Sequence, residues 1–196
     1  PTAKPATSKD IQGATQTGTP TFAGTIVQVN GEDKEITIKE NSYKLLDKDG
    51  NEVSTTPAYA ADGTTEIGTY SIDSATGQVT FTPTDKSYSG DVVPVKVQAA
   101  DTNGTTVETT YTPKITPVVP TSEDATSTDI QGQTQSGKPT FTEGNPNVPI
   151  DGDTPATFED GSTTKTVDGE GTYTVAPDGT VTFVPEKSFT GTASGV

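Results

Sequence analysis

The sequence predicts an all-β protein made of antiparallel β-sandwich modules in tandem, the second of them truncated. Three observations support this prediction. A block of the chain occurs twice, apolar side chains alternate with polar ones at a period of two, and turn-forming residues separate the alternating segments. Thr is the commonest residue, and its branched Cβ favours strands over helices, so no helix is expected.

The duplication has two matching parts. Residues 8–22 return almost letter for letter at 127–141, and residues 68–83 return at 171–185. The segments that precede each copy also match, and the one between the copies contains Pro117 and Pro120, which favour extended backbone. The predicted organisation is a linker over 1–7, a first module over 8–116, a Pro-containing linker over 117–126 and a second module over 127–196.

Alternation and turns define the strands within each copy. Tyr70 and Ile72 share one predicted face, as do Val79 and Phe81 on the next segment. Turns are expected at residues 49–51, 103–104 and 177–179, which are rich in Gly, Asn and Asp. About seven short strands in the first copy predict an immunoglobulin-like sandwich, without the Cys and Trp residues of antibody domains.

The second copy lacks part of the first. Residues 90–95 align with 191–196, and nothing corresponds to residues 96–115. A sheet without its neighbouring strand leaves backbone groups unpaired. We therefore expect the second copy to be poorly ordered or to be completed by strands from another molecule.

Composition excludes several classes of partner. The chain has 12 Lys+Arg against 27 Asp+Glu, a net charge of −15, and all of its cations are Lys. Such a surface repels nucleic acid and anionic membranes.

Cys is absent, which excludes disulfides and thiolate sites. Met is absent too, and no signal segment or long apolar run is present, so we expect an interior piece of a longer polypeptide.

Candidate catalytic and metal-binding residues are weak. Without His or Cys, a catalytic base would have to be a carboxylate or Lys, and the carboxylates lie mostly in turns. We predict no catalytic residue, no cofactor site and no enzyme activity. Residues 47–52 resemble part of a calcium loop but lack its remaining ligands, and 151–153 and 168–170 are weaker still. We interpret all three as turns and predict no metal site.

Two features of the sequence match patterns of covalent modification, and each has a simpler interpretation. A Lys-to-Asn or Lys-to-Asp amide cross-link can form inside a sandwich, and Lys44 and Lys96 lie on predicted strands. Alternation places Lys96 opposite Val95 and Val97, hence outward, so we predict solvated lysines. Asn103-Gly104-Thr105 matches the glycosylation acceptor pattern but is better explained as a hairpin tip.

The order of several motifs resembles the CshA-type fibril repeat of streptococcal surface adhesins. These motifs lie at residues 41–47, 67–70, 77–83, 88–90 and 101–113 of the first copy, and at 145–150 of the second. The resemblance covers nearly the whole chain. It implies a Gram-positive, secreted protein anchored to peptidoglycan through other parts of the parent chain, whose repeats build a fibril that presents a distal adhesive region.

The expected function is therefore structural, with the modules forming the stalk of a cell-surface adhesin. One alternative is that the repeats are themselves adhesive and bind host protein, glycan or other repeats. Another is that they associate laterally by pairing strands between molecules. Expected partners are neighbouring repeats, a host matrix or bacterial surface ligand engaged through the parent protein, and strands of other molecules. The residues of any binding site are not identified by the sequence.

Overall fold

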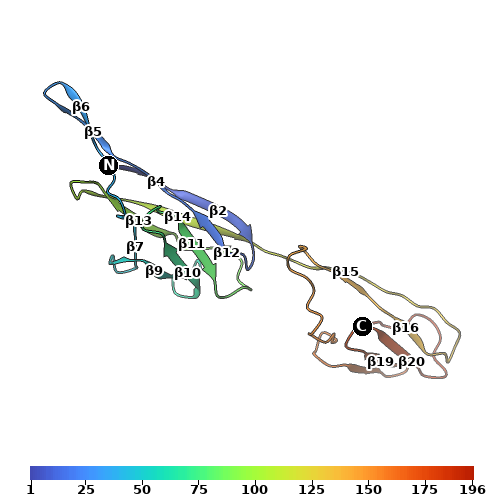
Figure 1. The fold of residues 1–196 in the computed structure, drawn as a ribbon. Helices are drawn as coiled ribbons and strands as arrows, with labels where there is room; N and C mark the ends of the chain where they lie inside the picture. Colours follow the sequence, from blue (N-terminus) through green and yellow to red (C-terminus); the bar gives the residue numbers. More distant parts are fainter. The chain divides into compact units, whose positions relative to one another are not determined.

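The computed structural model describes all residues from 1 to 196, which form two compact units, Pro1–Pro117 and Val118–Val196 (Figure 1). Every regular element is a strand, which confirms the predicted all-β fold of tandem sandwich modules. There is accordingly no helix of the length and hydropathy that a membrane crossing requires. The two units are described one at a time below.

The first unit contains two main sheets and two smaller pairings. Its strands are β1 (Thr2–Lys4), β2 (Ala6–Ile11), β3 (Gln16–Gly18), β4 (Thr21–Ala23), β5 (Thr25–Val29), β6 (Glu32–Ile36), β7 (Lys44–Leu46), β8 (Glu52–Val53), β9 (Thr55–Tyr59), β10 (Glu66–Ile72), β11 (Val79–Pro83), β12 (Gly90–Asp91), β13 (Val95–Ala100) and β14 (Thr106–Thr116). One sheet has the order β3-β11-β10-β9, and the other has β12-β14-β13-β7-β8, with β2 added beside β14. The pair β2–β14 is parallel, whereas all other pairs are antiparallel.

The core of the first unit lies between these sheets. Tyr70 and Phe81 come from the smaller sheet, and Leu45, Val97 and Tyr111 come from the larger one; all five are buried. Buried residues alternate with more exposed ones along β11 and β13, which gives each of these strands one face in the core and one face toward solvent. The faces predicted for Tyr70, Val79 and Phe81 are confirmed, because all three point into this core.

A hairpin of β5 and β6 extends beyond the sheets of the first unit (Figure 1). Its tip, at Asn30 and Gly31, has positive φ at both residues, as a tight turn requires. Ile26 and Val29 are exposed on it. The second unit has only a short bridge at the corresponding place, between Asn145 and Val148.

The second unit reproduces only part of this architecture. Its strands are β15 (Thr121–Glu123), β16 (Gln135–Gly137), β17 (Thr140–Thr142), β18 (Thr164–Val167), β19 (Gly171–Val175) and β20 (Val181–Pro185). They form a four-stranded sheet, β16-β20-β19-β18, and the pair β15-β17. This unit therefore contains one main sheet, where the first unit contains two.

Strand register is the same in both units wherever both have the strands. Phe81 pairs with Gln16 and Tyr70 in the first unit, and Phe183 pairs with Gln135 and Tyr173 in the second. Ala3 faces Phe22 across β1–β4, as Ser122 faces Phe141 across β15–β17. The repeated sequence thus specifies the same pairings twice.

The predicted linkers need correction. Residues 1–7 form β1 and the start of β2, which pair with β4 and β14. Within the predicted linker 117–126, residues 121–123 form β15. β1 and β15 each pair with a strand about twenty residues further along, and β2 pairs with β14 about a hundred residues away. The Pro and Thr content of these segments does not predict the pairings.

Candidate functional site

The acidic loop at residues 47–52 is a hairpin turn between β7 and β8. The Asp47 carboxylate accepts hydrogen bonds from the backbone N–H of Asp49 and of Asn51, both at 2.9 Å, and from the Asn51 side chain at 3.1 Å. The backbone and side-chain donors of Asn51 hold the pKa of Asp47 below its usual value. Its oxygens therefore stabilise the loop that carries them.

The same arrangement recurs at other turns. Asp101 is buried at the turn between β13 and β14 and accepts hydrogen bonds from the N–H groups of Asn103 and Thr105, both at 2.9 Å. Asp151 accepts from Asp153 at 3.0 Å in the second unit. Glu170, in the third acidic segment, accepts from Ser194. The structure contains no group of three or more acidic side chains arranged to hold a metal ion.

Asp62 has the strongest pKa shift among the turn carboxylates. This shift predicts how its contribution to stability changes as the pH falls. The Thr65 hydroxyl, followed by the N–H groups of Thr65 and Thr64, lowers the pKa of Asp62 from 3.8 to about 2. Because the folded value lies below the unfolded one, its contribution to stability is complete above pH 4 and is lost as the pH falls toward 2. Titration of the Asp62 carboxyl carbon by NMR should give a midpoint near 2; a midpoint near 3.8 would contradict the hydrogen bonding described.

The two candidate cross-linking lysines, Lys96 and Lys44, lie on β13 and β7. Lys96 Nζ is 3.6 Å from Glu108 Oε2, and both side chains are largely exposed. Lys96 thus points outward, as predicted, and forms a surface ion pair of small energetic value. Lys44 lies beside Gln98 in the same sheet. Asn103, in the glycosylation pattern, is exposed in the turn that Asp101 closes.

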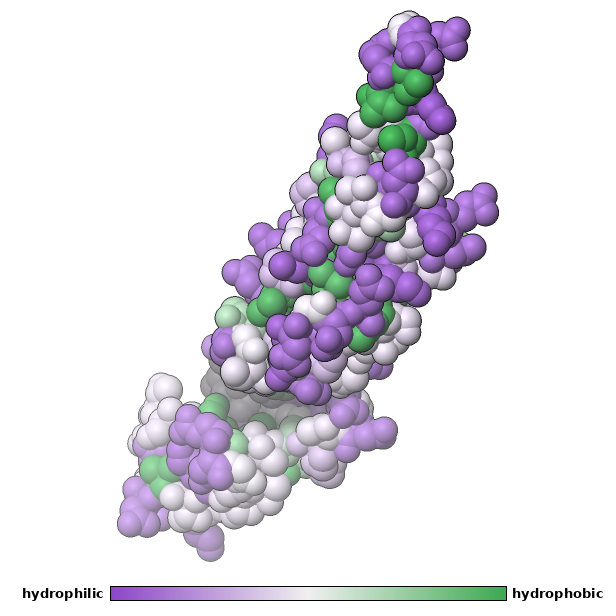
Figure 2. All heavy atoms as spheres, turned by 90° about the vertical axis from the view of Figure 1, so that its left-hand side faces the viewer, coloured by the Kyte–Doolittle hydropathy of each residue, from purple (hydrophilic) through white to green (hydrophobic).

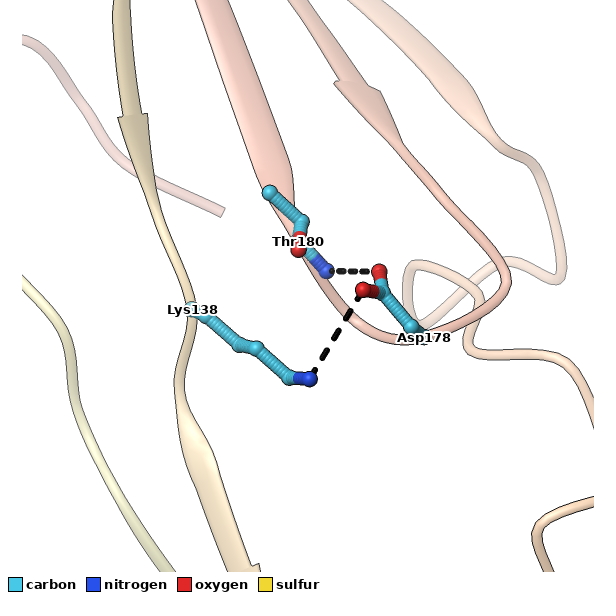
Figure 3. Close-up of polar contacts among 3 residues, drawn as sticks. All are labelled: Lys138, Asp178 and Thr180. Carbon is cyan, nitrogen blue, oxygen red and sulfur yellow. Dashed lines mark hydrogen bonds and ion pairs between the residues drawn. The ribbon is translucent and has the colours of Figure 1, made fainter.

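An ion pair in the second unit joins the segment between β16 and β17 to the predicted turn at 177–179 (Figure 3). Lys138 Nζ is 3.7 Å from Asp178 Oδ2, while Asp178 Oδ1 accepts the N–H of Thr180 at 2.9 Å. The Thr180 backbone and then Lys138 lower the pKa of Asp178. The first unit has Thr19 in place of Lys138, so this contact is particular to the second copy.

The most informative polar cluster is one that the sequence analysis did not identify. In the first unit, Ser8 Oγ donates to Gln16 Oε1 at 2.7 Å and lies 2.6 Å from the Tyr111 hydroxyl. Since Ser8 has a single proton to donate, Tyr111 donates to Ser8. Gln16 Nε2 then donates to the Lys114 carbonyl at 3.0 Å. Burial raises the pKa of Tyr111, which keeps this hydroxyl neutral.

Glycine makes room for the Tyr111 ring. A Cβ atom on Gly18 would lie 2.4 Å from the ring, a distance that packed atoms do not reach. The ring therefore occupies the space above β3, and its hydroxyl reaches Ser8 on β2. This cluster attaches β14, through Tyr111, to the start of the chain. We call the three residues that receive the ring, Ser8, Gln16 and Gly18, the tyrosine seat.

The second unit contains the same seat without its tyrosine. Ser127 Oγ donates to Gln135 Oε1 at 2.7 Å, which reproduces the Ser8–Gln16 bond. Above Gly137, the only heavy atom that an added Cβ would contact is Ala125 Cβ, at 3.5 Å. The matching Ser, Gln and Gly are visible in the repeat itself, and their spacing was the sequence signal for this cluster.

Tandem all-β modules that share register, turns and a tyrosine seat define the class of this protein as a repeat-module protein. The chain belongs to the family described as the surface adhesin CshA repetitive domain, whose model matches residues 1–115 and 117–196. This confirms the resemblance stated above. A comparison with curated proteins gives no match.

Two solved structures are among those to which the chain shows some similarity. One contains extracellular cadherin domains 3–6 of protocadherin gamma B2, with 11% identity and a TM-score of 0.28; the alignment covers 95% of this chain and 37% of that one. The other is a tetra-tandem repeat in the extending region of a large adhesion protein, with 19% identity, coverage of 94% and 41%, and a TM-score of 0.23. The chain spans less than half the length of each.

Proposed function

We propose that the chain is a non-catalytic stalk segment of a cell-surface adhesin fibril. Membership of a surface adhesin repeat family supports a surface role. The finer proposal is supported by the position of the aromatic side chains of the first unit. Tyr70, Phe81 and Tyr111 are buried in its core, whereas binding surfaces rely on accessible aromatic anchors.

The surface itself supports a spacer role. The face in Figure 2 is mostly hydrophilic or intermediate, with hydrophobic atoms in small separate clusters. A net charge of −15 makes modules repel one another and discourages clumping. In this proposal, the parent protein is a secreted protein of a Gram-positive cell wall, and a distal region carries the contact with a host or bacterial ligand.

An experiment with displayed repeats tests the stalk against the adhesive alternative. One, two or four copies of the chain would be placed between a cell-wall anchor and a known binding domain on a bacterial surface. We expect capture of a bead-bound ligand to increase with the number of copies, while cells that display repeats alone capture no matrix protein or glycan. Capture by repeats alone would favour the adhesive alternative.

A further inference from the structure

We propose that Asn30 is a site of spontaneous covalent modification, where the side-chain amide is hydrolysed to aspartate and isoaspartate through a cyclic imide formed with Gly31. The chain contains two Asn-Gly steps, Asn30-Gly31 and Asn103-Gly104. The first is open to the reaction, and the second is protected by its turn. This proposal is independent of the stalk function.

The reaction needs only the two residues and water. The backbone nitrogen of Gly31 attacks Cγ of Asn30, so that an N–Cγ bond forms, the bond from Cγ to the amide nitrogen breaks, and ammonia leaves with the proton of the Gly31 N–H. Water then opens the imide on either side, which gives a side-chain carboxylate or an isoaspartyl linkage. No electron is transferred. Because glycine has no Cβ atom, the attacking nitrogen is unhindered and its backbone is free to rotate.

The tip of the β5–β6 hairpin leaves this nitrogen free. Asn30 and Gly31 are exposed, and a Cβ atom added to Gly31 would meet no atom within 4 Å. The pairing of Val29 with Glu32 closes the hairpin, and the Gly31 N–H donates to no acceptor in the chain. Attack on Asn30 therefore breaks no hydrogen bond of Gly31 and displaces no packed side chain.

The second Asn-Gly step is fastened in its turn. The Gly104 N–H donates to the Asp101 carbonyl at 2.9 Å, and the Asn103 N–H donates to the Asp101 carboxylate, also at 2.9 Å. Asp101 is buried, and the N–H of Thr102 donates to the Thr37 carbonyl. Gly104 attacks Asn103 only after these hydrogen bonds open, which reduces the reactive population of this turn.

Modification of Asn30 opens the hairpin and leaves the sandwich intact. Both tip residues have positive φ, as the tight turn requires, and an isoaspartyl linkage adds one atom to the main chain at this turn. β5 and β6 pair only with each other, and no residue of either strand belongs to the core cluster. A two-stranded ribbon is marginally stable by itself, so its pairing is lost while the core remains. The first unit thus carries a hairpin that its own chemistry releases with time.

The test incubates the intact chain in mildly alkaline buffer and follows deamidation by peptide mapping with mass spectrometry, relative to a sample that was not incubated. A protease specific for Lys places each site in a peptide with no other Asn, residues 10–34 for Asn30 and 97–114 for Asn103. We expect conversion at Asn30 to be at least about tenfold faster than at Asn103, since only the second turn must open first. In denaturant, where neither turn persists, the two rates should be similar.

The matched variant is Asn30→Gln, because a glutamine side chain closes a larger ring far more slowly. It should abolish the mass increase of peptide 10–34 and leave that of 97–114 unchanged. In the incubated original chain, NMR amide signals of β5 and β6 should move to positions typical of an unpaired chain, while those of Tyr70 and Phe81 stay in place.

Three results would overturn the proposal. The first is no conversion at Asn30 over a period in which the denatured chain reacts. The second is a reaction at Asn103 that is as fast as that at Asn30 or faster in the folded chain. The third is conversion of Asn30 with the amide signals of β5 and β6 unchanged.

Discussion

The substitution Gly18→Val should unfold or severely destabilise the first unit. The new side chain would collide with the Tyr111 ring, which a Cβ alone would approach to 2.4 Å. Tyr111 is fully buried and its hydroxyl is bonded to Ser8, so the ring cannot move without breaking that bond. We expect the free energy of unfolding of the first unit to fall by at least about 3 kcal/mol, which is at the upper end of the range for overpacked cores. Urea unfolding followed by NMR signals of the first unit measures this.

The matched control is Gly137→Val at the equivalent position of the second unit. An added Cβ there meets only Ala125, at an ordinary contact distance of 3.5 Å. Its effect on the second unit should be under about 0.5 kcal/mol, as for a surface substitution. Equal losses of unfolding free energy at the two positions would contradict this explanation. They would show that each glycine is required by its own strand and that the Tyr111 ring is not the cause of the loss at Gly18.

The second large effect is expected for Phe81→Ala. Phe81 is completely buried and packs against Tyr70, with ring centroids 5.7 Å apart. Removal of this ring from a closed sandwich should reduce the stability of the first unit by about 3–5 kcal/mol, because it leaves a cavity. The same unfolding measurement detects it.

Phe183→Ala is the matched substitution in the second unit. Phe183 stacks on Tyr173 at 4.6 Å, but it is only partly buried because no second sheet covers it. Water already reaches its ring, so the expected loss is about half of that at Phe81. An equal or greater loss at Phe183 would mean that its side of the sheet is closed.

Local sequence features predicted much of the fold. Turns and strand faces depend on residues close together in the chain. The prediction is confirmed for the turns at 49–51, 103–104 and 177–179 and for the inward faces of β10 and β11. The pairing of β2 with β14 joins residues about a hundred positions apart. No local pattern in residues 1–7 distinguishes a paired strand from a linker, which is why the sequence alone predicts a linker there.

The tyrosine seat illustrates the same limit for the site. Ser8, Gln16 and Gly18 are individually ordinary residues of a polar, Gly-containing segment. Their common role depends on Tyr111, which the topology brings to them from the far end of the module. The repeat contained a usable signal, since it preserves these three residues in a copy that lacks the tyrosine.

The central claim is that one repeated segment is a strand in the first unit and unpaired in the second, because only the first contains β14. Hydrogen exchange at the two matching segments, 6–11 and 125–130, tests it most directly. In dilute solution of the whole chain, the amides of residues 6–11 that face β14 should exchange slowly, and their counterparts in 125–130 should exchange nearly as fast as in an unfolded chain. Equal protection of the two segments would contradict this account.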